Sequence, residues 1–238
     1  MYKYDRLTAA KRLRRYIFSR AIKLLFLSNS SRQETLSSCC EFVLRQNQVQ
    51  NEHPNHEFYL SRERLIEKVV QDLGETWIGV EFGVAYGDLS RWMLRSGNLN
   101  RCMAWHGYDS FFGLPFTWGN LPAGTFSTGG KPPNLKEEIF NWHVGLVEDT
   151  TIELEFLNVR ESYVPAFIVF DMDLYEPTSL VLSRLKPKLQ VGDILFFDEA
   201  FHAEESQAIK EFSLEENNLS LEPIGFTIFA QCFRIVRI

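Results

Sequence analysis

The sequence has few cysteines, no long apolar segment and no excess of positive charge, and each shortage argues against a class of protein. Its 4 cysteines in 238 residues include no CxxC pair, which argues against a zinc ribbon and a disulfide-stabilised scaffold. The longest uncharged run, residues 110–130, is too rich in glycine and proline for a membrane-spanning helix. A net charge of −6 argues against nucleic acid binding. We therefore expect a soluble, cytoplasmic protein.

Hydrophobic residues make up 45% of the chain, including 20 Phe and 5 Trp, which is enough for one domain with a large core. Charge is uneven, because residues 1–23 hold eight Lys or Arg and a single acid. Within this arm Leu13, Ile17, Ala21 and Leu24 recur at helical spacing, which predicts an amphipathic helix. Such a helix packs on its own domain or on a twin subunit, with membrane-surface binding as the alternative. We expect a homo-oligomer.

Two further helices are predicted in the N-terminal region, over residues 33–46 and 62–73, the latter with Ser61 as its N-cap. From Trp77 onward the hydrophobic pattern changes to short apolar runs, each separated from the next by a helix-length segment. The runs are WIGVEF, CMAWHGYD, FIVFD and DILFFD, and their apolar character on both faces is typical of a parallel sheet covered by helices. We therefore divide the chain into an N-terminal helical region, 1–74, and an α/β domain, 75–238.

The end of the chain is predicted to form an antiparallel hairpin. Residues 226–230 and 232–238 are rich in β-forming residues and are too close for a crossover helix. The predicted fold is therefore a Rossmann-like α/β sheet that is mostly parallel, with a reversed C-terminal edge strand.

Polar residues follow the first predicted strands, at the edge where open parallel sheets bind ligands. Glu81 begins the segment EFGVAYG, in which Gly83 permits close approach of a ligand and Gly87 opens a helix. The alternative is ordinary strand-to-helix turn chemistry. Asp109 ends the second strand, where an acid can accept the hydroxyls of a ribose. A further strand is predicted around residues 142–147, and Asp149 after it is suited to the adenine end of such a ligand, or else caps a helix.

Four carboxylates follow two later strands: Asp171 and Asp173 after one, Asp198 and Glu199 after the next. If these strands are neighbours, the carboxylates converge within roughly 10 Å and repel one another unless they share a positive group. A Mg²⁺ ion is the simple answer, because hard cations prefer oxygen ligands. A hydrated acidic rim is the alternative.

Two features beside these strand ends are candidates for the acceptor site. The loop 110–133 is too long for an ordinary connection, and its Phe112, Phe116, Trp118 and Phe126 would either wall a binding site or pin the loop to the sheet. His202 follows the second acidic pair closely and is either a catalytic base or the start of a helix.

Four segments together resemble the macrocin O-methyltransferase family of S-adenosylmethionine-dependent enzymes. They are EFGVAYG (81–87), GYDSFFGLP (107–115), DMDLYEPT (171–178) and GDILFFDE (192–199). The resemblance covers residues 77–212. It implies a class I methyltransferase fold, with a small-molecule acceptor.

Carried onto this chain, the resemblance implies three groups of site residues. Glu81, Gly83, Tyr86 and Gly87 would line the methionine half of the cofactor, and Asp109, with Ser110 beside it, would hold the ribose. Asp171, Asp198 and Glu199 would bind Mg²⁺, and Asp173 would be the general base, with exchange between Asp171 and Asp173 left open. The sequence thus favours an O-methyltransferase of sugars or other natural products. The alternatives are a carboxyl or peptide methyltransferase and a nicotinamide-dependent oxidoreductase. The absence of a GxGxxG motif argues against the oxidoreductase.

Overall fold

The computed structural model describes residues 57–118, 121–151, 154–158, 160–161, 164–214, 217–227 and 229–238. The chain divides into two compact units, Met1–Phe58 and Tyr59–Ile238. Of the first unit only the two-residue strand β1 (Glu57–Phe58) is described. The helices predicted around Leu13 and over residues 33–46 therefore lie outside the described residues. The cavity and the carboxyl-end residues of the sheet belong to the second unit.

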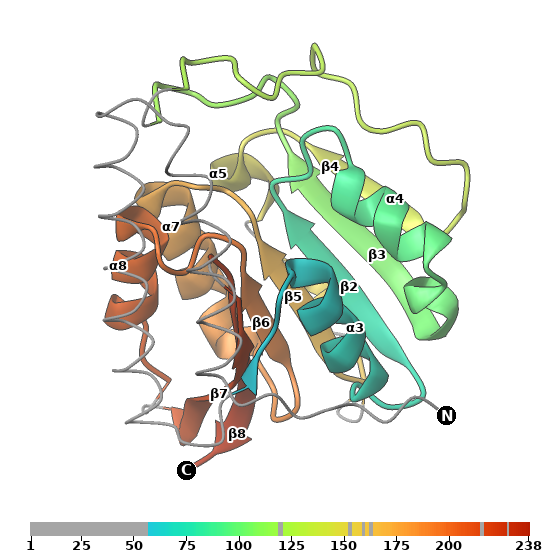
Figure 1. Cartoon of the computed structure of the whole chain (residues 1–238), viewed down its shortest axis with the longest axis vertical. Coiled ribbons are helices and arrows are strands. Elements are labelled where there is room, and N and C mark those ends of the chain that lie inside the picture. Colours follow the sequence, from blue (N-terminus) through green and yellow to red (C-terminus); the bar gives the residue numbers. More distant parts are fainter. Residues whose placement is uncertain are drawn as a thin grey trace, which may run out of the picture. The chain divides into compact units, whose positions relative to one another are not determined.

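The described strands of the second unit form one mixed sheet, in the order β7-β8-β6-β5-β2-β3-β4 (Figure 1). The strands are β2 (Trp77–Phe82), β3 (Cys102–Asp109), β4 (Phe140–Val144), β5 (Ala166–Phe170), β6 (Ile194–Phe197), β7 (Leu219–Phe226) and β8 (Gln231–Arg237). All pairings from β4 through to β6 are parallel. Every residue of β2, β5 and β6 is buried, as expected for central strands covered on both faces.

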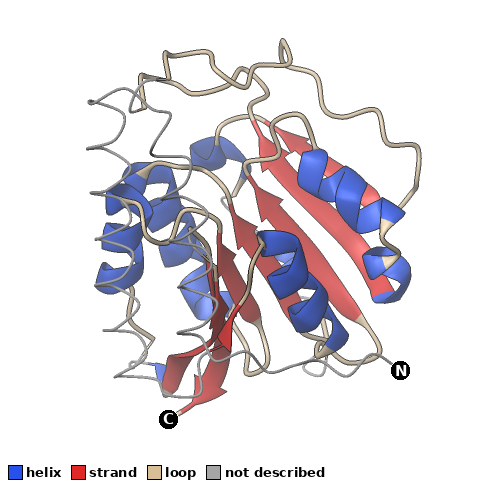
Figure 2. Ribbon diagram, in the orientation of Figure 1, coloured by secondary structure: helices blue, strands red, loops and turns tan. Residues whose placement is uncertain are grey.

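Helices cover both faces of the sheet (Figure 2). One face packs against α3 (Arg62–Gln71), α4 (Asp88–Arg95) and the short η1 (Asn98–Arg101). The other packs against α5 (Val147–Thr150), α6 (Glu155–Asn158), α7 (Tyr175–Leu185) and α8 (Ala203–Glu211), with η2 (Lys186–Lys188) after α7. Along β5, Phe167 and Val169 join the first core while Ala166, Ile168 and Phe170 join the second. This alternation is the pleat of a strand buried on both sides.

The mostly parallel Rossmann-like fold is confirmed, but three details differ from the prediction. The reversed strand β8 is not at the edge, because it pairs antiparallel with both β6 and β7. β7 ends at Phe226, where the prediction began its first hairpin strand, because Thr227 makes a tight turn: its Oγ1 accepts hydrogen bonds from the backbone N–H groups of Phe229 and Ala230. β4 lies at Phe140–Val144 rather than at 142–147.

A buried ion pair fixes the amino ends of β5 and β6, opposite the edge that carries the site. Arg160 donates from both terminal nitrogens to the two oxygens of Asp193, each at 2.5 Å. Asp193 also accepts hydrogen bonds from the backbone N–H groups of Ala166 and Gln190, both at 2.8 Å. Breaking a buried pair of this kind typically costs ~3–5 kcal/mol. The pair therefore ties the two strands whose other ends carry the four predicted carboxylates.

Within the described part of the chain, no helix is long and apolar enough to cross a membrane.

Candidate active site

A cavity of about 740 Å³ opens at the carboxyl ends of the central strands. Its volume lies within the range of small-molecule and cofactor sites. Eight of the residues predicted from the sequence to form the site line it: Glu81, Gly83, Tyr86, Asp109, Ser110, Asp171, Asp173 and Glu199. The topology thus brings side chains from four segments of the chain into one site.

Glu81 lies at the base of the cavity and is almost fully buried, with 1% of its surface exposed. Its Oε2 accepts hydrogen bonds from the Ser90 hydroxyl at 2.5 Å and from the Trp105 indole N–H at 3.0 Å. Burial outweighs these donors and raises the pKa of Glu81 to about 7. A cationic ligand beside Glu81 would therefore favour the ionised carboxylate and be favoured by it.

The turn after β2 contacts the carboxyl ends of β3 and β5. Gly83 has φ +88°, and a Cβ there would lie 1.8 Å from the carbonyl oxygen of Asp171, so only glycine fits. The backbone N–H of Ala85 donates to Asp109 Oδ2 at 2.7 Å, and that of Phe111 donates to Oδ1 at 2.6 Å. Both carboxylate oxygens are thereby held in place, and each can accept a further hydrogen bond from a ligand.

Four of the predicted residues are not among the described residues that line the cavity: Gly87, Asp149, Asp198 and His202. Asp198 lines a second, smaller cavity beside it. Gly87 is the N-cap of α4, where a Cβ would meet the ring of Pro133 at 2.3 Å. Asp149 lies in α5, and the preceding residues 145–148 line the cavity instead. His202 is at the N-cap of α8, with its ring centroid 5.0 Å from that of Trp118, which does line the cavity. The proposed roles of Gly87, Asp149 and His202 stay predictions.

The predicted cluster of carboxylates forms because β5 and β6 are neighbours, with Phe170 opposite Phe197. Burial, with repulsion from nearby carboxylates, raises the pKa of Asp173 to about 6 and that of Glu199 to about 7. The pKa of Asp171 is also raised, by burial and by Asp198. Asp173 has a positive φ of 65°, which is unusual for a residue with a side chain and typical of functional sites.

Glu205 of α8 is hydrogen-bonded to the backbone of this cluster of carboxylates. Its Oε2 accepts a hydrogen bond from the backbone N–H of Glu199 at 3.0 Å, and its buried Oε1 has no hydrogen-bond partner. Burial raises the pKa of Glu205 well above its ordinary value. Sequence reasoning missed Glu205, since it lies within a helical pattern rather than at a strand end.

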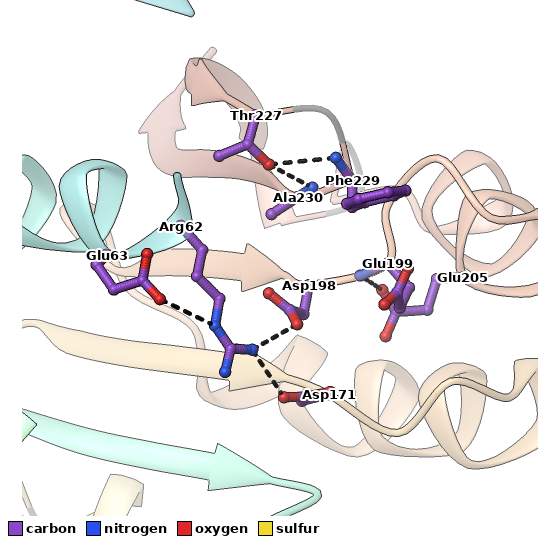
Figure 3. Close-up of polar contacts among 9 residues, drawn as sticks. All are labelled: Arg62, Glu63, Asp171, Asp198, Glu199, Glu205, Thr227, Phe229 and Ala230. Carbon is purple, nitrogen blue, oxygen red and sulfur yellow. Dashed lines mark hydrogen bonds and ion pairs between the residues drawn. The ribbon is translucent and has the colours of Figure 1, made fainter. Parts of the chain in front are cut away.

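The positive group among these carboxylates is the guanidinium of Arg62, in the first turn of α3 (Figure 3). Its Nη1 lies 2.6 Å from Asp198 Oδ2 and 3.3 Å from Asp171 Oδ2. Burial alone would lower the pKa of Arg62, but the two aspartates outweigh it and the pKa is raised. The predicted N-cap is confirmed, because Ser61 Oγ accepts a hydrogen bond from the backbone N–H of Arg64.

The residues present do not fit the predicted Mg²⁺ site of Asp171, Asp198 and Glu199. In the described ranges, no group of three or more His, Cys, Asp or Glu side chains is arranged to hold a metal ion. The physical reason is that Arg62 already bridges the two aspartates. Arg62 lies more than 100 positions from either partner in the sequence and belongs to none of the four motifs, so sequence reasoning did not find it.

The long loop after β3 runs along the carboxyl edge of the sheet (Figure 1). Several of its residues line the cavity. Phe116, Trp118 and Phe126 line the cavity, as one of the two sequence interpretations expected. Phe112 is 66% exposed and is not among the described lining residues. The loop is pinned by hydrogen bonds between Leu114 and the 124–125 backbone at 2.8 and 2.9 Å.

Comparison with known proteins supports the fold. No family model matches the chain, and no curated protein matches it. Among solved structures, the O-methyltransferase NovP is 19% identical with a TM-score of 0.51, over 72% of this chain and 79% of that chain. CalS11, a calicheamicin methyltransferase, is 20% identical with a TM-score of 0.52, over 98% of this chain and 95% of that chain. The chain therefore has the Rossmann-like fold of class I methyltransferases.

Proposed function

We propose that this protein is an S-adenosylmethionine-dependent O-methyltransferase that acts on a hydroxyl group of a small molecule. The observation that carries the proposal is the placement of Glu81 and Asp109 in one cavity at adjacent strand ends of a class I methyltransferase fold. NovP and CalS11, the two similar structures with that fold, are both methyltransferases, which supports the same chemistry here.

Different groups of cavity residues suit the methionine, ribose and adenine portions of the cofactor. Glu81 would face the ammonium of the methionine portion, where the Gly83 turn leaves the backbone open. Asp109 would accept the ribose hydroxyls through the lone pairs that its two backbone donors leave free. Residues 145–148 would border the adenine. The bound cofactor supplies a methyl group that its sulfonium already activates.

The remaining part of the cavity suits an acceptor that has a hydroxyl group and an apolar body. Asp173 lies there, and with a pKa of about 6 it is mostly ionised at pH 7 and able to take the hydroxyl proton. Leu114, Phe116 and Trp118 form an apolar wall on the loop side that excludes water and orients the acceptor. A sugar or other natural-product hydroxyl fits this combination, and the similarity to a calicheamicin methyltransferase supports the same substrate class.

Calorimetric titration with S-adenosylhomocysteine and, separately, with NADH tests the class of cofactor. We expect the wild-type chain to bind S-adenosylhomocysteine and not NADH. Asp109→Asn should weaken that binding roughly ten- to hundredfold, because a hydrogen bond to a charged group contributes about 1.5–3 kcal/mol. Asp72→Asn, which changes an exposed pair with Lys68, is the matched control and should bind as wild type. Binding of NADH instead would contradict the proposal.

The acceptor class is tested by following S-adenosylhomocysteine release with a panel of sugars, phenols, carboxylic acids and peptides. We expect turnover with hydroxyl compounds only. Turnover confined to carboxylic acids would contradict the O-methylation of hydroxyls while leaving the cofactor assignment intact.

A further inference from the structure

Arg62 occupies the place where two carboxylates from neighbouring strands need a positive charge. One nitrogen, Nη1, contacts both Asp198 and Asp171, and Nε lies 3.9 Å from Glu63 (Figure 3). The side chain keeps 32% of its surface exposed, so the guanidinium faces the cavity rather than the protein core. Of the described residues that line the main cavity, Arg62 is the only Lys, Arg or His.

A divalent cation and Arg62 compete for the same oxygens. Mg²⁺ requires carboxylate oxygens at 2.0–2.1 Å in near-octahedral geometry. Oδ2 of Asp198, which would face such an ion, is held by Arg62 at 2.6 Å, and Oδ2 of Asp171 lies 3.3 Å from the same nitrogen. A metal ion that used either of these Oδ2 atoms could therefore bind only after the guanidinium had moved away. Moving it would leave an arginine without its partners, which opposes metal binding.

A second, smaller cavity of about 220 Å³ lies against Arg62 and Asp198 and shares Glu199 with the main cavity. Its remaining walls are Leu60 and Ser61, which directly precede α3, and Thr227, Phe229 and Ala230. Arg62 thus borders both cavities. Shortening its side chain would free space for a hydrated ion next to two carboxylates that had lost their counter-charge.

We propose that Arg62 is a built-in replacement for a divalent cation, so that the acceptor end of this site works without a metal ion. The proposal rests on the proposed function for the identity of the acceptor end, but its main test does not. In this role Arg62 neutralises Asp171 and Asp198. A guanidinium has five N–H donors, and the contacts above use Nη1 and Nε, so the other amino group is suited to donate to the acceptor oxygen. Asp173 is then left to take the acceptor proton.

Binding of Mn²⁺, followed by electron paramagnetic resonance, tests the proposal without any methyl transfer. We expect the wild-type chain to leave the signal of free Mn²⁺ unchanged, and Arg62→Ala and Arg62→Gln to bind Mn²⁺ at least tenfold more tightly. Arg64→Ala, which removes an exposed arginine two residues along the same helix, is the matched control and should behave as wild type. Arg62→Lys keeps the charge and should also leave the signal unchanged.

Two results would overturn the proposal. Tight Mn²⁺ binding by the wild-type chain that Asp198→Asn abolishes would show that the carboxylates hold a metal despite Arg62. The second result is that neither the wild-type chain nor the folded Arg62→Ala and Arg62→Gln variants bind Mn²⁺. Arg62 would then be only a member of a structural ion pair.

If neither Arg62 variant folds, the wild-type chain still decides through chelation. Methyl transfer unchanged by EDTA supports the proposal, and transfer that EDTA abolishes and Mg²⁺ restores overturns it. Failure of the proposed function is recognised separately, by the absence of S-adenosylhomocysteine binding.

Discussion

Replacing Glu81 by Gln should make the ligand-free protein more stable at high pH while weakening cofactor binding. The pKa of Glu81 is about 7 in the folded chain against 4.5 for an ordinary Glu, because burial disfavours the charged form. Between these pH values the folded state holds a proton that the unfolded state has lost, so stability falls as pH rises. A difference of this size corresponds to about 3 kcal/mol at pH values above 7.

Urea unfolding of wild type and Glu81→Gln over a range of pH measures this effect. Asp173 and Glu199 shift in the same direction, but they are present in both proteins, so the difference between the two isolates Glu81. We expect the difference in unfolding free energy to move by about 3 kcal/mol in favour of Gln as pH rises from below 4.5 to above 7. Glu222→Gln, at an exposed position of β7, should show no such movement.

A pH-independent difference between wild type and Glu81→Gln would refute the reasoning. It would mean that the Ser90 and Trp105 donors compensate the burial of the carboxylate fully. In that case the pKa of Glu81 would not be raised by burial, and a cationic ligand would not be needed to favour its ionised form.

Three further predictions concern other parts of the fold and site. Asp193→Ala should lower the urea unfolding free energy by ~3–5 kcal/mol, because Arg160 is left buried without its partner. Gly83→Ala should cost about 2 kcal/mol or more in stability and weaken S-adenosylhomocysteine binding in calorimetry, since φ is +88° and a Cβ would meet Asp171. Asp173→Asn should lower turnover ~10²–10⁴-fold. It should also remove an ascending limb near pH 6 from the wild-type rate profile, because the base acts when deprotonated.

The strand ends were predictable from the sequence because buried strands are short apolar runs and the polar residue after each run marks its carboxyl end. That logic located Glu81 and Asp109 correctly, and it brought Asp171 and Asp198 together. It also indicated that these carboxylates repel one another unless they share a positive group, for which the sequence suggested Mg²⁺.

The identity of that group could not be predicted, because Arg62 reaches the aspartates only through the docking of α3 beside the strand ends. No local pattern encodes such a contact. The interior position of β8 is a similar case: hairpin periodicity predicts that β7 and β8 pair, but not which of them meets β6. Long-range packing decides both.

Crystals grown with S-adenosylhomocysteine test the central claim most directly. We expect electron density in the main cavity, with the amino group of the ligand on the Glu81 side and the ribose hydroxyls within hydrogen-bond distance of Asp109. Density for the ligand elsewhere, or a cavity that stays empty at saturating ligand, would contradict that claim.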